Sequence, residues 1–167
     1  MKLILLALTL AAGGIAQTTA VQELCAPCHT GPSEEFDKHP HKAKSVSCDA
    51  CHGASEQHRN SQGMTPPDKV AGPAEVPAMC GACHTKQFAA FKESRHFAVL
   101  QTNARGTATC IRCHGNHSLR TAAAAQAQCE RCHDGRPAAC KAVPAKVIAK
   151  VSCANCHVPH TLKKVGG

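Results

Sequence analysis

Two cysteines and a histidine recur along the chain in one fixed spacing, Cys-x-x-Cys-His. Two thiols at this spacing can add to the two vinyl groups of a haem, and the following histidine can then bind the iron as an axial ligand. The spacing occurs six times, and we number the copies motifs 1 to 6 in chain order: Cys25, Cys28 and His29; Cys48, Cys51 and His52; Cys80, Cys83 and His84; Cys110, Cys113 and His114; Cys129, Cys132 and His133; Cys153, Cys156 and His157. The pattern predicts six covalently attached c-type haems.

A Cys-x-x-Cys pair by itself also fits a zinc knuckle, a disulfide or a thioredoxin-like redox pair. Here each of the six pairs is followed by histidine, although histidine makes up only 12 of the 167 residues. A zinc site takes four ligands from two such pairs and does not require a histidine after each. The recurrence therefore favours haem over the other three interpretations.

The remaining histidines equal the motifs in number. Six haems with two axial histidines each require twelve, and the chain has twelve. We therefore expect the six outside the motifs to be distal iron ligands: His39, His41, His58, His96, His117 and His160. Solvent exposure of either His39 or His41 is the alternative for that pair. Methionine could serve at most two haems, through Met64 and Met79.

Spacing restricts how these ligands pair. His114 and His117 are three residues apart, as are His157 and His160. Axial ligands lie on opposite faces of a porphyrin, so such a short segment cannot supply both, and the second histidine should bind a neighbouring haem. We expect one helix over 85–100, with Phe88 on the His84 face. His96 would then lie about 18 Å from His84 along the axis and should serve a different haem.

The composition predicts the fold class. The chain has no Trp, no Tyr and four Phe, so its side chains alone would bury little apolar surface. Six porphyrins would supply that surface, at about one haem for every 25 residues. We expect a mostly irregular chain with a few short α-helices, one of them over the Ala-rich 121–128, and little or no β structure. The haem stack would form the core, as in multihaem cytochrome c architectures.

The formal charge of +8 does not by itself indicate nucleic-acid binding. The aromatic stacking residues and the recognisable binding folds that accompany it are absent from the sequence. Each ferric haem would add a net charge of about −1 through its propionates, leaving the loaded protein nearly balanced. We expect no nucleic-acid partner.

The first twenty residues have the pattern of a secretory signal peptide. A short basic start precedes an apolar run from Leu3 to Ala12 and then small residues, with cleavage expected after Ala16 or Ala20. An uncleaved membrane anchor is the alternative. Export to the periplasm or the cell exterior follows, and residues 21–167 would form one hexahaem domain. Residues 61–77, rich in Pro and Gly, would separate two haem clusters.

The chain resembles the small multihaem c-type cytochromes of bacteria and archaea, especially the doubled-CxxCH and periplasmic electron-conduit kinds. The resemblance rests on the six motifs, on the Cys-x-x-Cys-His-x-x-His forms at 110–117 and 153–160, and on the segment from Cys80 to His96. It implies an exported electron carrier with stacked, mostly bis-histidine haems. Cys140 departs from the pattern and could be a buried thiol, an intermolecular disulfide partner or a contact near a haem.

Iron with two histidine ligands has no vacant position, so the sequence predicts six haem c groups in electron transfer rather than an enzyme. Two alternatives stay open. One is a multihaem reductase or oxidase with a five-coordinate haem, and the other is a protomer that self-assembles into an extracellular filament. The expected partners are redox proteins, including a membrane-associated quinol-oxidising complex or an outer-membrane electron-transfer complex.

Overall fold

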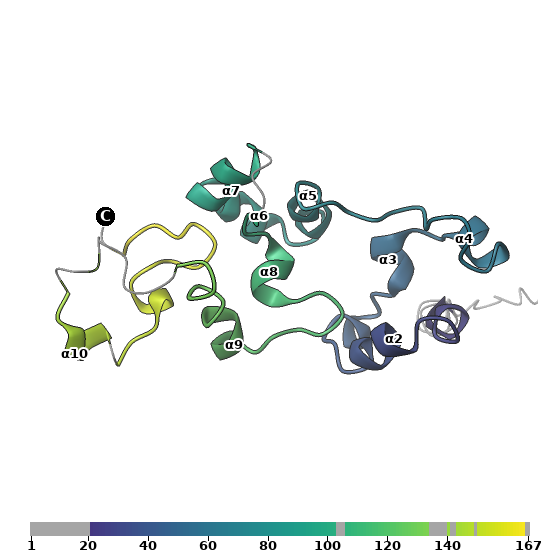
Figure 1. The fold of residues 1–167 in the computed structure, drawn as a ribbon, viewed down its shortest axis with the longest axis horizontal. Helices are drawn as coiled ribbons and strands as arrows, with labels where there is room; N and C mark the ends of the chain where they lie inside the picture. The colour runs from purple at the N-terminus through teal and green to yellow at the C-terminus, as the bar shows by residue number, and fades with distance from the viewer. Residues whose placement is uncertain (1–20, 103–105, 134–139, 141–142, 149, 166–167) are drawn as a thin grey trace, which may run out of the picture. The chain divides into compact units, whose positions relative to one another are not determined.

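The computed structural model describes residues 21–102, 106–133, 140, 143–148 and 150–165. The expected signal peptide over 1–20 lies outside these residues. The helical elements are short and follow one another in the order α2 (Thr30–Phe36), η1 (Lys42–Lys44), α3 (Cys48–His52), α4 (Glu56–Asn60), α5 (Val76–Gly81), α6 (Thr85–Lys92), α7 (Arg95–Leu100), α8 (Cys110–His114), α9 (Ala122–Gln126), α10 (Ala145–Ile148) and η3 (Cys153–Asn155) (Figure 1).

The expected fold class is confirmed. Short helices alternate with irregular segments, and the β structure among the described residues is one antiparallel bridge between His157 and Lys164. No helix in that part of the chain is long and apolar enough to cross a membrane. The architecture agrees with a chain whose apolar core comes mainly from bound groups.

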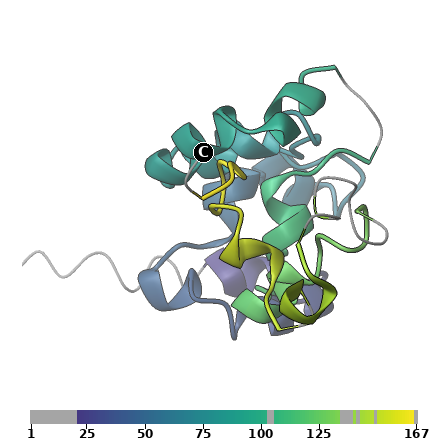
Figure 2. The ribbon, with the colours of Figure 1, turned by 90° about the vertical axis from the view of Figure 1, so that its left-hand side faces the viewer.

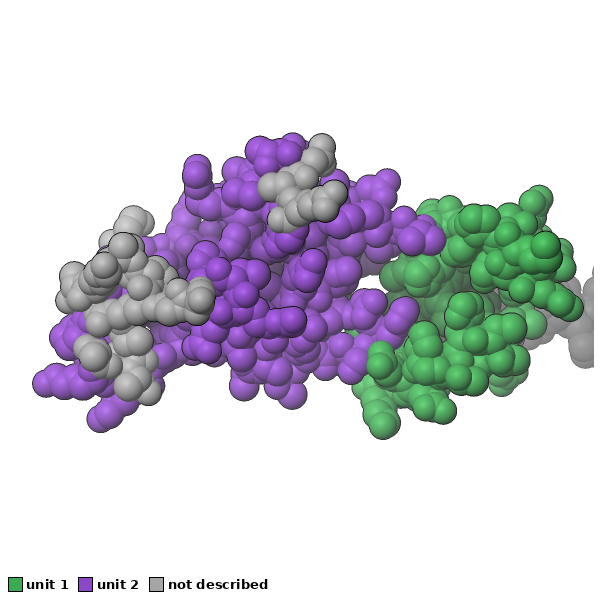
Figure 3. Space-filling model, in the orientation of Figure 1, with its two compact units in different colours: residues 1–69 green, residues 70–167 purple. Residues whose placement is uncertain are grey.

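The chain divides into two compact units, residues 1–69 and 70–167 (Figure 3). The first contains motifs 1 and 2, and the second contains motifs 3 to 6. The division falls within the Pro- and Gly-rich segment 61–77, and α5 begins near the end of that segment with Pro77 in its first turn.

In unit 1, Asp68 closes a loop back onto the end of motif 2. Its carboxylate accepts the Ser55 N–H at 2.8 Å, and its own N–H donates to the Ser55 hydroxyl oxygen at 3.1 Å. The Lys69 N–H donates to the His52 carbonyl at 3.2 Å. These three bonds join residues 13 to 17 positions apart and fix the segment after α3.

In unit 2, α5, α6 and α7 pack together, and α8 contacts α5 (Figures 1 and 2). The edge of the Phe97 ring lies against Phe88 and Phe91, with centroids 6.3 and 5.7 Å apart. The buried hydrophobic side chains of the described residues are Val76, Phe91 and Leu100. Such a small apolar core agrees with the composition.

The prediction of a single helix over 85–100 is wrong. Helix α6 ends at Lys92 and α7 begins at Arg95. Between them Ser94 adopts an extended conformation and caps α7, its hydroxyl accepting the Phe97 N–H at 3.1 Å. An N-cap serine is among the strongest signals for a helix start, and here it overrides the apolar periodicity. The helix expected over 121–128 is present as α9, a shorter helix capped by Thr121.

Candidate functional site

Each motif folds as one helical turn. In motifs 1, 3, 5 and 6 the histidine N–H donates to the carbonyl of the first cysteine, at 3.0, 2.9, 2.8 and 2.9 Å. Motifs 2 and 4 are themselves the helices α3 and α8. Residues i, i+3 and i+4 share one face of a helical turn, so both thiols and the imidazole of a motif emerge on the same side. This is the arrangement that covalent attachment of one haem requires.

The backbone after the histidine takes one of two forms in motifs 1 to 4. His29 and His84 lie at the N-caps of α2 and α6, so motifs 1 and 3 lead directly into a helix. Motifs 2 and 4 instead end at Gly53 and Gly115, with φ of 73° and 88°. This left-handed backbone favours glycine, and a Cβ at Gly115 would also collide with the Ser118 carbonyl oxygen. The same two-motif arrangement therefore occurs in both units.

The motifs come together in pairs through their first cysteines. The thiols of Cys25 and Cys48 are neighbours: burial raises the pKa of Cys48, and the nearby Cys25 thiol raises it further. Cys129 likewise neighbours Cys153: burial raises the pKa of Cys129, and the nearby Cys153 thiol raises it further. Motifs 1 and 2 therefore adjoin, as do motifs 5 and 6.

Motifs 3 and 4 adjoin in the same way. The interaction of the neighbouring Cys80 and Cys110 thiols lowers the pKa of Cys80 to about 7 and raises that of Cys110, whose burial raises it further. Cys113 of motif 4 also lies near Cys132 of motif 5; burial, more than that neighbour, raises its pKa, while Arg120 lowers it. Motifs 3 to 6 thus form a connected series within unit 2.

Three histidine pairs each join a motif histidine to one from outside the motifs. The ring centroids lie 5.9 Å apart for His29 and His58, 5.8 Å for His133 and His96, and 5.9 Å for His114 and His160. The ring planes of these pairs are inclined by 20°, 32° and 23°.

These pairs are too widely spaced to be stacked rings. Parallel rings in contact lie about 3.5 Å apart, so a centroid separation of 5.9 Å would displace them sideways by roughly 4.7 Å, beyond any overlap. Two imidazoles bound to one metal through about 2 Å bonds would place their centroids about 6 Å apart. The separations fit a pair of rings that face one iron atom, so the residues present fit the haem predicted from the motifs.

Burial keeps two of these histidines neutral. It is the main cause of the lowered pKa of His96 and of His160. The neighbouring His133 lowers the pKa of His96 further, and His114 and then His84 lower that of His160. Neutral imidazole is the form that binds a metal.

Hydrogen bonds fix the tautomer of several rings. Nδ1 of His52, His58 and His157 lies 3.1, 2.7 and 3.1 Å from the carbonyl oxygens of Lys69, Thr65 and Leu162. A carbonyl only accepts, so Nδ1 carries the proton and Nε2 presents its lone pair. Metal-bound histidines are commonly oriented by this kind of bond. These three rings are therefore in the form that can bind iron through Nε2.

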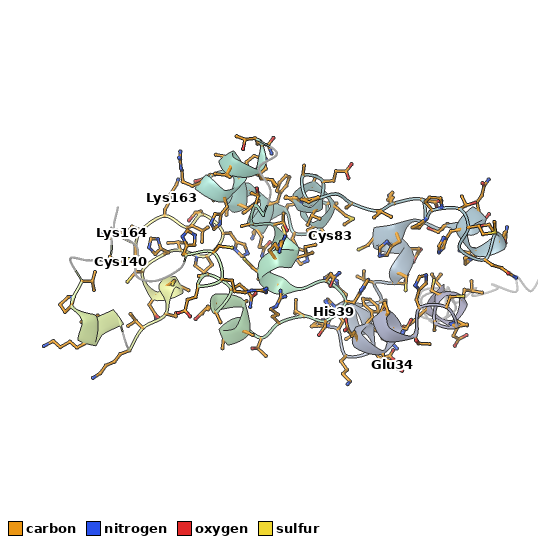
Figure 4. The ribbon with its side chains drawn as sticks, viewed as in Figure 1. Glu34, His39, Cys83, Cys140, Lys163 and Lys164 are labelled. Atoms are coloured by element: carbon orange, nitrogen blue, oxygen red, sulfur yellow. The ribbon has the colours of Figure 1, made fainter. Side chains whose placement is uncertain are left out.

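His39 has the opposite arrangement. Its Nδ1 accepts the His41 N–H at 3.1 Å, which leaves the proton of the neutral ring on Nε2. His39, labelled in Figure 4, is only 5% exposed, and its ring lies 5.5 Å from that of Phe36, centroid to centroid. The His39 and His41 centroids are 4.6 Å apart, too close for the two to share one iron. Of the two histidines, His41 is the better candidate for a ligand.

The remaining predicted residues lie outside these three histidine pairs. His117 lies in a bend just beyond α8, and His84 lies near enough to His160 to affect its pKa. Cys140 is half-buried, between segments that lie outside the described residues.

The division into units does not distribute the histidines evenly. Residues 1–69 hold two motifs and three other histidines, whereas residues 70–167 hold four motifs and three others. Within unit 2, the three other histidines would complete three of the four haems that its motifs predict. The twelve-for-twelve count of the whole chain conceals this difference.

Reasoning from the sequence did not identify the paired first cysteines. A signal for them exists, because motifs 1 and 3 are followed by Thr and a helix, whereas motifs 2 and 4 are followed by Gly. Reading that alternation as a repeat would have grouped motif 1 with motif 2 and motif 3 with motif 4.

Comparison with known proteins agrees with this chemistry. Residues 79–158, which include motifs 3 to 6, match the family described as cytochrome c554 and c-prime. Over 94 residues the chain is 30% identical to the C-type polyheme cytochrome OmcC of Geobacter sulfurreducens (strain ATCC 51573 / DSM 12127 / PCA). That match covers 51% of this chain but only 12% of the relative. No solved structure matches. The matches and the motifs together support a multihaem c-type cytochrome.

Proposed function

We propose that this protein is an exported electron carrier that holds six covalently attached c-type haems, most of them with two histidine ligands. The observation that carries the proposal is the pairing of motifs through their first cysteines, Cys25 with Cys48, Cys80 with Cys110 and Cys129 with Cys153. Haems attached to neighbouring thiols would be held close together in space. Close spacing of redox groups is what transfer of electrons along a protein requires.

A haem with two histidine ligands supplies one-electron exchange without an open coordination position. The chain would contribute attachment through two thiols, one imidazole from each motif and, at His58, a ring of the correct tautomer from a neighbouring segment. Two histidines per iron also keep reduction potentials lower than histidine–methionine ligation does. These contributions suit a carrier better than a catalyst.

Spectroscopy of the holoprotein tests the proposal. Ferric EPR should show at least five low-spin haems, and carbon monoxide should bind at most one haem of the reduced protein. The histidine count of unit 2 is the observation that favours the enzymatic alternative, in which one haem is open to a small nitrogen or sulfur compound. A stoichiometric high-spin signal together with turnover of such a compound would overturn the carrier function in favour of that alternative.

We place the contact with a redox partner at motif 6, where both cysteines are exposed; in motifs 1 to 5 the first cysteine is half-buried. Residues 157–165 fold back onto this motif through the bridge between His157 and Lys164 and through the Val165 N–H bond to the Cys156 carbonyl, 2.8 Å long.

The surface of this turn combines apolar and basic side chains. Val158, Leu162 and Val165 are exposed beside Lys163 and Lys164, which lie next to each other near the C-terminal end of the chain (Figure 4). Lys163 is paired with Glu93 at 2.6 Å. Residues 70–167 carry 13 Lys and Arg against 4 Asp and Glu. An exposed apolar surface with excess positive charge suits an acidic redox protein.

Substitution of Lys164 tests this surface. K164E should slow reduction by an acidic electron donor several-fold at low salt, and the difference should shrink as salt screens the charges. The matched control is K146E, which makes the same charge change on α10 and should have the smaller effect. Equal effects of the two variants would show that net charge alone matters and would remove motif 6 as the contact.

A further inference from the structure

We infer which distal histidine serves which motif: His58 completes the haem of motif 1, His96 that of motif 5 and His160 that of motif 4. The inference rests on the proposed function, because it takes the haems to be present, and it adds the connections between them. It follows from three ring pairs that lie at the separation of two imidazoles on one iron.

The strongest case is His58. Its ring lies 5.9 Å from that of His29, and its Nδ1–H donates to the Thr65 carbonyl at 2.7 Å, which leaves Nε2 for the metal. The turn after α4 wraps around this residue: the Gly63 N–H donates to the His58 carbonyl at 2.8 Å, and the Thr65 N–H donates to the Ser61 hydroxyl oxygen at 2.9 Å. The turn therefore orients the ring.

His96 is positioned by the helix that carries it. The Ser94 cap sets the start of α7, and the Phe97 ring packs against Phe88 and Phe91 of α6. His96 is half-buried, and its ring lies 5.8 Å from that of His133. In one continuous helix His96 would lie farther along the axis. The end of α6 at Lys92 and the separate start of α7 place it beside His133 instead.

His160 is held by the turn after motif 6. Its φ of 69° is a left-handed conformation that is uncommon among residues other than glycine. The Leu162 N–H bond to the Val158 carbonyl, 2.8 Å long, and the Val158 N–H bond to the Lys163 carbonyl, 2.9 Å long, close the turn around it. Unusual backbone of this kind persists where the surroundings impose it, and it is concentrated at functional sites. The ring of His160 lies 5.9 Å from that of His114.

The three assignments share a pattern. Each distal ligand comes from the segment that follows a different motif: the segment after motif 2 serves motif 1, the segment after motif 3 serves motif 5, and the segment after motif 6 serves motif 4. Attachment of one haem therefore helps to order the ligand of another. The first cysteines pair motif 3 with motif 4 and motif 5 with motif 6. His96 and His160 each link the segment after a motif of one pair to a motif of the other pair.

A vinyl marker tests the assignment of His58. H58Q should add one high-spin ferric haem to the spectrum of the wild type, and that haem should bind carbon monoxide when reduced. C25A leaves the haem of motif 1 attached by one thioether and with one free vinyl group, whose conjugation with the porphyrin shifts its absorption to the red. In H58Q/C25A the carbon monoxide adduct should carry this shift. In the matched control H58Q/C48A, which marks the haem of motif 2, it should not.

Two results would overturn the assignment. One is a marked adduct in H58Q/C48A but not in H58Q/C25A, and the other is an H58Q protein with six haems that binds no more carbon monoxide than the wild type. If H58Q fails to mature, H58M keeps a ligand and should give one low-spin haem with a sulfur-to-iron charge-transfer band and a raised potential. Absence of that band would also contradict the assignment. Either failure leaves six haems and electron transfer intact, whereas fewer than six haems in the wild-type protein would refute the proposed function itself.

Discussion

Substitution of Gly81 by alanine should destabilise the protein, because this residue of motif 3 lies against Phe88 of α6. A Cβ at this position would lie 2.6 Å from Cγ and 2.8 Å from Cβ of Phe88, closer than side chains tolerate. If Phe88 stays in place, overpacking costs about 1–3 kcal/mol. If Phe88 swings away, the protein loses the edge contact with Phe97, about 0.5–1.5 kcal/mol, and the Lys92 ammonium above the ring, about 0.5–1 kcal/mol. Both routes give a cost of about 1–3 kcal/mol.

Thermal unfolding of the holoprotein, followed by far-UV circular dichroism, measures this cost. One kcal/mol corresponds to about 2–4 °C in a chain of this size, so G81A should lower Tm by about 2–12 °C. G31A is the control, because a Cβ on Gly31 of α2 meets no atom within 4 Å, and its Tm should be unchanged or slightly raised. In G81A/F88L the two losses should combine to less than their sum, because the second substitution removes the clash. A G81A protein as stable as wild type, or strictly additive losses, would refute the packing argument.

Two further predictions concern iron ligands. H41Q should add one high-spin ferric haem to the EPR spectrum of the wild type, whereas H39Q should leave that spectrum unchanged, because His39 Nδ1 already accepts the His41 N–H; the reverse result would show that His39 is the ligand. S94A removes the cap of α7 at a cost of about 0.5–2 kcal/mol, so His96 should leave its iron at a lower urea concentration than in wild type, as reported by carbon monoxide binding during the titration. An unchanged urea midpoint would show that the cap does not position His96.

The sequence was sufficient for the fold class, because six haem motifs and four Phe leave no other source of a core. It was misleading for 85–100, where the apolar positions have helical periodicity on both sides of Ser94 and the cap decides the boundary. Helix ends depend on which donor captures the free N–H groups, and periodicity does not contain that information.

The site was predictable in kind but not in its connections. Spacing gave the residues of each motif, since two thiols and an imidazole on one turn are a local property. The contacts of His96 with His133 and of His160 with His114 join residues 37 and 46 positions apart, and they depend on how the segments between them fold. The tautomer of His39 depends on the backbone N–H of His41 reaching Nδ1, which no spacing rule contains.

The most direct test of the account is the number of haems on the mature chain. A pyridine haemochrome assay against protein concentration, combined with the intact mass, measures this number without reference to any fold. The account predicts six covalently bound haems per chain, one for each of motifs 1 to 6. Fewer than six on fully matured protein would contradict it.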